Sequence, residues 1–259
     1  MKIAVLGAGI SGLGSAYILS QKHEVDVYEK DSRLGGHART TQIQDEGMLF
    51  GVDTGFLVFN EPTYPLLTKL FKQLDVKIEN SDMSFAFWDK IKNIAYNGSS
   101  IKGMFAQKRN LFSLSHYKMI KDILDFNEKA NSDILYNNRN LDKSLGEYIS
   151  SYSDAFKQRY ILPMGAAIWS TPSDEMNDFP ARTFLTFFKN HGLLGIDSHH
   201  QWLTVSNGSI NYVNKIKEKI SGKIILNSNV IKIQRVENGV YLIHKNGEKT
   251  FYDKVVLAM

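Results

Sequence analysis

The sequence contains no cysteine and no apolar run long enough to cross a bilayer. The lack of cysteine excludes a disulfide framework, a cysteine-ligated zinc or iron–sulfur site and a cysteinyl link to a cofactor, and it fits a reducing compartment. The first apolar run, residues 3–6, leads straight into glycines and lacks the cleavage site of a secretory signal. These absences predict a cytoplasmic protein that is soluble or at most peripheral to a membrane.

The sequence also lacks a strong excess of positive or negative charge. The 259 residues include 31 Lys and Arg against 27 Asp and Glu, for a net charge of +4, and the two signs are scattered along the chain. Such a balance favours an ordinary solvated surface, so no nucleic-acid partner is expected, and attraction to anionic lipid is the weaker alternative. The hydrophobic fraction of 43% is typical of a globular protein, and the length allows two packed units.

The chain opens with the pattern of a strand, a tight turn, a helix and a second strand. Residues 2–6 form a short run that is apolar after Lys2, 11–20 carry small and apolar residues at helical spacing, and 24–29 alternate as a strand does. Two strands joined by one helix imply a right-handed parallel crossover. Further along, the patterns predict a helix at 62–74, a hairpin of 83–88 and 91–96, a helix at 116–135, an exposed connector at 131–142, a strand at 201–205, a helix at 208–220, and strands at 223–226, 230–236, 240–244 and 254–258.

The glycines after the first strand match G-x-G-x-x-G, with Gly7, Gly9 and Gly12 enclosing Ile10 and Ser11. The first glycine permits a tight turn, the second lets a pyrophosphate approach the backbone, and the third lets helix and strand pack closely. The free N–H groups and the dipole of the helix then favour the diphosphate charge. The hexapeptide alone is a weak signal, but here it lies between a strand and a helix.

An acidic residue, Glu29, ends the second strand 17 residues beyond Gly12. A carboxylate at this position can accept hydrogen bonds from the hydroxyl groups of an adenosine ribose. It also disfavours a 2′-phosphate, so NADP is not expected at this site. The alternative, a plain glycine turn with a surface glutamate, does not explain why strand, helix and acid all lie in register.

The segment after Glu29 indicates which dinucleotide is bound. Residues 31–40, with Arg33, Gly35, Gly36 and His37, resemble the R-x-G-G-R-x-x-T segment of the flavin-containing amine oxidase superfamily, which includes phytoene-desaturase-like and protoporphyrinogen-oxidase-like enzymes. The resemblance implies that this loop lies along FAD, and that the neighbouring Lys30 and Arg39 also contribute to the cofactor site. His37 departs from the pattern, because many members have arginine there.

The resemblance continues over essentially the whole chain. Residues 53–56 resemble a D-x-G-x element that passes near the flavin, which implicates Gly55, Phe56 and Leu57. Val230 falls on the strand whose valine backbone contacts the adenine in the family. Residues 53–60, 163–172 and 190–194 match a subgroup of bacterial NAD/FAD-binding proteins most closely.

The resemblance implies an α/β architecture. A Rossmann-like FAD-binding domain, with a parallel sheet plus a β-meander, would comprise residues 1–60 and 205–259, with an inserted α+β substrate-binding and helical region at 61–204. The last five residues form an apolar strand with nothing after it. We therefore expect the C-terminal portion to be missing, with its second FAD-contacting segment and a lysine near the flavin, and a separate C-terminal half is one expected partner.

The resemblance further implies an FAD-dependent oxidoreductase in which the flavin accepts a hydride equivalent at N5. The substrate would be an apolar molecule, such as a lipid or isoprenoid chain, or an amine. No catalytic residue stands out, and no metal site is expected. Two other hypotheses stay open, namely an NAD dehydrogenase using the same turn, and an inactive or split fragment that binds a nucleotide without catalysis on its own.

Several side chains allow both a functional and a structural interpretation. His191 suits a substrate cavity or a helix-end hydrogen bond, and Asp53 suits a cofactor contact or, slightly preferred, a backbone cap. The adjacent histidines 199 and 200 lack partners at ligand spacing and favour a surface position over a metal site. The aromatic residues at 169, 184, 187, 188 and 202 suit a pocket wall but more often form core.

Overall fold

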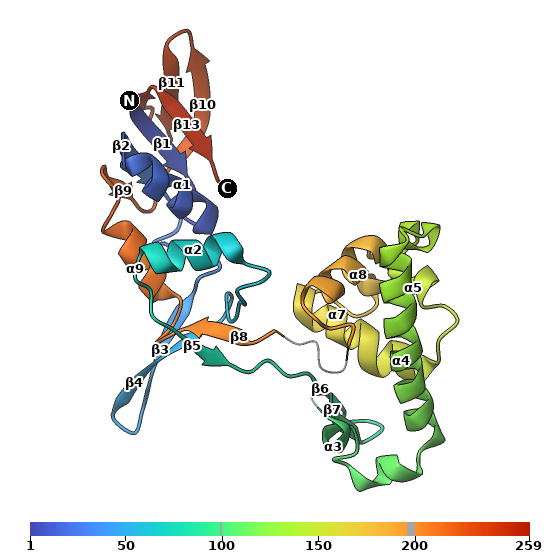
Figure 1. Cartoon of the computed structure of the whole chain (residues 1–259). Coiled ribbons are helices and arrows are strands. Elements are labelled where there is room, and N and C mark those ends of the chain that lie inside the picture. The colour runs from blue at the N-terminus through green and yellow to red at the C-terminus, as the bar shows by residue number, and fades with distance from the viewer. Residues whose placement is uncertain (99, 196–199) are drawn as a thin grey trace. The chain divides into compact units, whose positions relative to one another are not determined.

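The computed structural model describes residues 1–98, 100–195 and 200–259, and the chain divides into two compact units (Figure 1). The first unit comprises Met1–Ser81 and Trp202–Met259, and the second comprises Asp82–Gln201. Residues 61–81, which the sequence assigns to the inserted region, pack with the first unit. The reason is a long-range contact, because apolar side chains of this segment, such as Phe71, are buried against the segment that follows residue 201, where Tyr212 lies.

A parallel sheet forms the centre of the first unit. Its strands lie in the order β13–β1–β2–β9, with bounds Lys254–Leu257, Lys2–Leu6, Glu24–Tyr28 and Ile224–Ile225. The first and last strands of the chain therefore lie side by side, as the blue and red ends show in Figure 1. Strand β1 is buried from Ile3 to Leu6, which explains its apolar run, and β2 is buried from Val25 to Tyr28, where Asp26 is a buried polar residue. Helix α1 (Ile10–Ser20) joins them, so the expected parallel pairing of the two strands through one helix is confirmed.

An antiparallel meander packs beside this sheet. It consists of β10 (Val230–Val236), β11 (Gly239–His244) and β12 (Lys249–Tyr252), of which β12 is absent from the sequence-based expectations. A parallel sheet with a meander is the architecture that the resemblance implies, and this expectation is confirmed.

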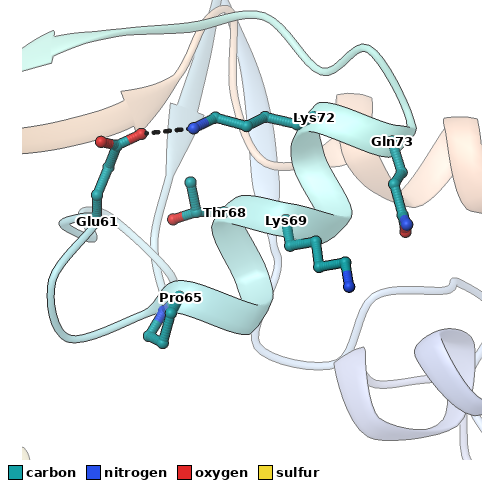
Figure 2. Close-up of a pocket in the computed structure, with 6 residues that line it drawn as sticks. All are labelled: Glu61, Pro65, Thr68, Lys69, Lys72 and Gln73. Atoms are coloured by element: carbon teal, nitrogen blue, oxygen red, sulfur yellow. Dashed lines mark ion pairs between the residues drawn. The ribbon is translucent and has the colours of Figure 1, made fainter.

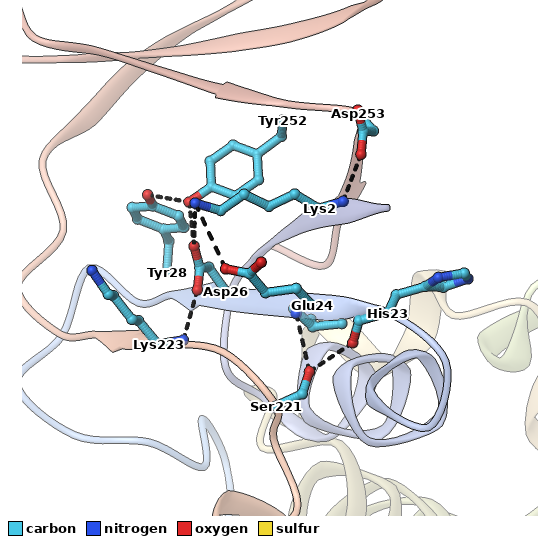
Figure 3. A network of polar contacts seen from close by, with 10 residues as sticks. Lys2, His23, Glu24, Asp26, Tyr28, Ser221, Lys223, Tyr252 and Asp253 are labelled. Atoms are coloured by element: carbon cyan, nitrogen blue, oxygen red, sulfur yellow. Dashed lines mark hydrogen bonds and ion pairs between the residues drawn. The ribbon is translucent and has the colours of Figure 1, made fainter.

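A polar network centred on buried Asp26 ties the two sheets together (Figure 3). The Tyr252 hydroxyl donates to Asp26 at 2.7 Å and lies 2.7 Å from the Tyr28 hydroxyl, while the Lys223 amide donates to the other Asp26 oxygen at 2.6 Å. The Lys2 ammonium is 3.7 Å from the same carboxylate. Burial, reinforced by the bonds to Tyr28 and Asp26, raises the pKa of Tyr252, so this hydroxyl stays a donor.

The remaining elements of the first unit surround the sheet edge at which β1 and β2 end. They are the hairpin β3 (Thr40–Asp45) and β4 (Met48–Asp53), helix α2 (Pro65–Gln73), the pair β5 (Ile78–Ser81) and β8 (Trp202–Val205), and helix α9 (Ile210–Lys217). The expected helices at 62–74 and 208–220 both exist, with shorter bounds. Phe59 and Phe71 are fully buried between these elements, 5.3 Å apart by ring centroids.

The second unit is built around a long helix and an aromatic core. Its elements are β6 (Ala86–Asp89), β7 (Ile94–Asn97), α3 (Ile101–Met104), η1 (Lys108–Phe112), α4 (Leu114–Leu135), η2 (Arg139–Asp142), α5 (Leu145–Tyr148), α6 (Asp154–Phe156), η3 (Lys157–Ile161), α7 (Leu162–Trp169), η4 (Glu175–Asp178) and α8 (Ala181–Asn190). Ser113 caps α4, and Ser144 with Glu147 forms a capping box on α5. Phe126, Phe156 and Phe184 are fully buried in the core.

The structure corrects two sequence-based expectations in this unit. The exposed connector expected at 131–142 is shorter, because residues up to Leu135 continue α4 and buried Leu141 lies in η2; the exposed residues 136–138 connect the two. The hairpin turn lies at 90–93 rather than 89–90. There the Asp89 carboxylate accepts the Lys92 amide at 2.9 Å, and Asn93 adopts a left-handed φ of 50°. Across the described ranges, no helix combines the length and apolar character needed to cross a membrane.

The network at Asp26 predicts a stability effect. Replacing Tyr252 with Phe removes the bond to Asp26 and the bond between the two tyrosines, and it leaves a buried carboxylate short of one donor. We expect Tyr252→Phe to lower the free energy of unfolding by about 1–3 kcal/mol, measured by urea denaturation. Tyr241→Phe is the control, because its ring packs on Phe251 and no bond is recorded for its hydroxyl within the described residues. Equal loss in both variants would contradict a structural role for the network.

Candidate nucleotide-binding site

The glycine loop between β1 and α1 is fitted tightly to the sheet. Gly7 has a φ of 99°, which favours glycine, and its amide donates to the Tyr28 carbonyl at 2.8 Å. A Cβ on Gly7 would collide with the carbonyl of Ala258, and one on Gly12 would collide with the carbonyl of Gly7. The chain itself therefore requires both glycines, for the turn and for the close packing of helix and strand.

Gly9 has a different role. Its φ of −73° is open to any residue, and a Cβ there would meet no described atom within 4 Å. Packing of the described chain therefore gives no reason for a glycine, whereas a ligand lying against the backbone does.

Helix α1 begins beside Gly9 without a side-chain cap. The first bond within the helix runs from the Leu13 amide to the Gly9 carbonyl at 2.9 Å. The amides of Ile10, Ser11 and Gly12 precede it, so they have no acceptor within the helix, and Ile10 and Ser11 are exposed. A helix start with free amides and a positive dipole end suits a diphosphate.

The Glu29 carboxylate lies directly against this loop. One of its oxygens accepts the Ala8 amide at 2.7 Å, and the other accepts the Asp31 amide at 2.9 Å. Glu29 is 9% exposed, so it contacts the loop and a small part of it is accessible from solvent. Each carboxylate oxygen retains a lone pair, which leaves acceptors for ribose hydroxyls.

The second glycine-containing loop packs on the first. The Gly35 amide donates to the Ala8 carbonyl at 2.8 Å, and a Cβ on Gly36 would lie 3.0 Å from the Cα of Gly9. Gly35 and Gly36 have φ angles of 107° and 57°, so the backbone conformation itself favours glycine at both positions. The Arg33 guanidinium donates to the Gly36 carbonyl at 2.9 Å, and this bond holds the loop closed.

A third segment lies against the second loop. The Phe56 amide donates to the His37 carbonyl at 3.0 Å, and a Cβ on Gly55 would collide with the same carbonyl. The His37 side chain is exposed, so the position where many family members have arginine faces solvent. Leu57 is also exposed, and its carbonyl accepts the Thr204 hydroxyl at 2.8 Å.

Val230, the candidate for the adenine contact, follows two residues whose backbone amides are bonded to the segment of Glu29. The Ser228 amide donates to the Glu29 carbonyl at 2.8 Å, and the Asn227 amide donates to the Asp31 carbonyl at 3.1 Å. Half-buried Val230 begins β10 two residues later. The structure thus brings the glycine loop, Glu29, the second loop and the start of β10 together. Lys30 and Arg39 are exposed in the same region, and no side-chain bond is recorded for either among the described residues.

Asp53 accepts hydrogen bonds at the start of α9, in agreement with its interpretation as a backbone cap. Its carboxylate accepts the Ser209 amide at 2.8 Å and the Ser209 hydroxyl at 2.7 Å, at the start of α9. The Thr40 hydroxyl also donates to it, which links the end of the second loop to α9. Burial, with a contribution from Asp53, raises the pKa of Tyr212 to about 12, so this phenol stays protonated. The sequence alone did not predict that Asp53 joins Thr40 to Ser209. The one feature that indicated it was the presence of an acidic residue two positions before Gly55.

The other side chains that allow both a functional and a structural interpretation make contacts within the fold. His191 ends α8, with Nδ1 2.9 Å from the Phe187 carbonyl and its ring stacked on Phe187. Phe184 and Phe188 lie in the core of the second unit, stacked at 4.2 Å. His199 lies outside the described residues. Among the residues that the structure does describe, no group of three or more His, Asp or Glu side chains is placed to hold a metal ion.

Two surface hollows lie in the first unit. A hollow of about 510 Å³ on α2 is lined by Glu61, Pro65, Thr68, Lys69, Lys72 and Gln73, and Figure 2 shows the Glu61–Lys72 ion pair across it at 3.2 Å. It contains none of the site residues expected from the sequence, so we do not assign it to the nucleotide. A second hollow, of about 420 Å³, has Arg33, Leu34, Arg39, Ile210 and Lys217 among its lining residues and borders the second loop.

Comparison with known proteins identifies the family. A family model described as flavin containing amine oxidoreductase matches residues 10–259. The chain belongs to this family. The match confirms the resemblance seen in the sequence and makes flavin, rather than nicotinamide, the cofactor of the family.

Individual relatives agree with the family assignment. The 4,4′-diapophytoene desaturase (4,4′-diaponeurosporene-forming) of Staphylococcus aureus strain MRSA252 is 33% identical over 88 residues, which are 34% of this chain and 17% of that protein. A putrescine oxidase variant has a similar structure, with a TM-score of 0.69 and 19% identity over 100% of this chain and 57% of its own. A fatty acid isomerase from P. acnes gives a TM-score of 0.62 and 14% identity over 99% and 58%.

These likenesses confirm the fold class, because the two structures cover nearly all of this chain. The chain in turn spans 57% and 58% of their lengths. It has the fold of the family's flavoproteins over the part that it represents.

The contrast between Gly9 and the other glycines yields a prediction. Gly9→Ala places a methyl group where a diphosphate would lie and disturbs no described contact. We expect its free energy of unfolding to change by less than about 1 kcal/mol, while ADP binding, measured by calorimetry, weakens at least tenfold. Gly14→Ala is the matched control, since Gly14 lies in the same helix and its Cβ would also meet nothing within 4 Å. Unchanged ADP affinity in Gly9→Ala would exclude this loop as the phosphate site.

Proposed function

We propose that the first unit binds the ADP portion of FAD. The diphosphate would lie on the amides at the start of α1, beside Gly9, and Glu29 would accept the ribose hydroxyls. Val230 would contact the adenine through its backbone, while residues 33–39 and 55–57 would lie along the rest of the cofactor. The observation that carries this proposal is the bond between the Glu29 carboxylate and the Ala8 amide, because it holds the acid at the loop whose second glycine faces open space.

The residues present fit the cofactor of the family. The free amides supply partial positive charge for the phosphates, and the glycines of both loops allow close backbone approach. When bound, the flavin supplies the redox chemistry by accepting a hydride equivalent at N5. The contribution of this chain is to bind and orient the cofactor. No side chain of the described residues is assigned a catalytic role.

We further propose that the chain is part of an FAD-dependent oxidoreductase that oxidises or desaturates a small molecule. The names of the similar proteins include a diapophytoene desaturase, a putrescine oxidase and a fatty acid isomerase, which favours an apolar or amine substrate. The aromatic second unit would supply the substrate-binding region. A cytoplasmic location is part of the proposal and rests on the cysteine-free composition.

One observation favours a second candidate function. The chain spans only 57–59% of the similar structures, so a nucleotide-binding part that is inactive until a C-terminal half joins it is the alternative. Both candidates predict ADP and FAD binding by the first unit, but only the first predicts turnover by this chain alone.

Ligand-dependent stabilisation tests the cofactor proposal. A ligand at 100 times its dissociation constant stabilises the folded state by about 2.7 kcal/mol, so FAD and ADP should raise the melting temperature of this chain. NADPH should not, because Glu29 disfavours a 2′-phosphate. If NADH stabilises the protein while FAD does not, the flavin assignment fails. If no nucleotide does, the binding proposal fails as a whole.

A variant of Glu29 tests the proposed ribose contact. Glu29→Gln keeps an oxygen for the Ala8 amide but loses the charge and one acceptor. We therefore expect ADP and FAD to bind about 1–3 kcal/mol more weakly, measured by calorimetry at a temperature where the free variant is folded, because the variant also loses the acceptor of the Asp31 amide. Glu24→Gln is the control, because Glu24 is an exposed acid on the same strand. Equal affinities in the two variants would rule out the ribose contact.

A further inference from the structure

The second unit carries an unusual exposed surface formed by residues 88–98 and 100–118, which we call the basic tip. It comprises the end of β6 and its turn into β7, helices α3 and η1, and the start of α4. In Figure 1 these elements lie near the N-terminal end of α4, away from α5. Seven large hydrophobic side chains of the tip are exposed, with Ile91 97% and Phe112 89% accessible. The seven are Trp88, Ile91, Ile101, Leu111, Phe112, Leu114 and Tyr117.

Hydrogen bonds hold the segments of the tip against one another. The Arg109 guanidinium donates to the Lys92 carbonyl at 2.7 Å, and the Gln107 amide group donates to the Asn93 carbonyl at 2.9 Å. Buried Asn110 donates to the Ala95 carbonyl at 3.0 Å. The hairpin turn and η1 therefore form one ordered surface, so their exposed side chains are presented together.

The tip also concentrates positive charge. It contains six basic residues, all exposed, and one acidic residue, Asp89; the six are Lys90, Lys92, Lys102, Lys108, Arg109 and Lys118. Its net charge of +5 exceeds the +4 of the whole chain. No ion pair is recorded for any of the six within the described residues. Although acidic and basic residues are nearly balanced over the whole sequence, the tip is one strongly basic surface.

The combination points to one kind of partner. Cations without acidic partners, interleaved with exposed aromatic and aliphatic side chains, suit an anionic membrane surface, where the charges meet headgroups and the apolar groups enter the interface. Tryptophan in particular favours this interface. A nucleic acid would use the charges but would leave Ile91, Ile101 and Leu114 without a role.

We propose that the basic tip docks the protein on anionic lipid membranes. The attachment is peripheral, with Lys and Arg drawn to the headgroups and the apolar side chains inserted shallowly between them. Because each basic residue near such a surface contributes about a fivefold gain in binding, the charges and the apolar groups act together. High ionic strength weakens the docking, since it screens the electrostatic part.

Vesicle binding by the complete chain tests the proposal. Co-sedimentation compares vesicles of phosphatidylcholine alone with vesicles containing 30% phosphatidylglycerol, at low and high salt. The triple variant K90Q/K102Q/K108Q should bind the anionic vesicles at least tenfold more weakly. The control variant K219Q/K232Q/K245Q removes three exposed lysines of the first unit and should bind as the unmodified protein does. The variant I91S/F112S should lose binding with all its charges in place.

The outcomes separate the proposal from its alternatives. Equal losses in the tip variant and the control variant would overturn it, because net charge alone would then explain the binding. Binding to neutral vesicles at the same strength would overturn the role of the cations. No vesicle binding, together with a dimer that I91S/F112S dissociates in light scattering, would assign the tip to a contact between copies instead. Circular dichroism of each variant verifies that the fold is unchanged.

Discussion

The contact between the end of the second strand and the loop after the first determines the geometry of the nucleotide site. Parallel pairing of β1 with β2 sets Leu6 beside Tyr28, and the Glu29 carboxylate then reaches the Ala8 amide. The amide of Gly7 and the carbonyl of Ala8 are bonded to β2 and to the second loop, so the loop has little freedom to move. This rigidity leaves the helix start in a shape that suits a diphosphate before any ligand arrives.

Two different physical requirements explain the glycines of the site. Gly7 and Gly12 are needed because other parts of the chain occupy the space of a side chain, whereas Gly9 borders space that no described residue fills. Glycines of the first kind report on folding. Gly9 differs from the equally open Gly14 because it lies at the uncapped start of α1, next to the loop that Glu29 contacts, and this position indicates a ligand. The distinction separates a stable strand–helix turn from a binding loop, which the hexapeptide pattern by itself does not.

The two units use their surfaces differently. In the first, polar contacts such as those of Asp26 and Asp53 are internal and join elements distant in sequence. In the second, an aromatic core supports a tip whose cations and apolar side chains face outward. A protein acting on apolar molecules would gain from reaching them at a membrane, which connects the proposed function with the proposed docking.

The sequence by itself determined the strand–helix–strand opening, the glycine pattern with its acid, two of the three strands of the meander and the resemblance to the family, because these features depend on local periodicity and on short motifs. Tertiary structure alone decided that 61–81 joins the first unit and that Asp53 accepts hydrogen bonds from the start of α9. Each of these depends on contacts between residues far apart in the chain, and spacing along a sequence carries no information about them.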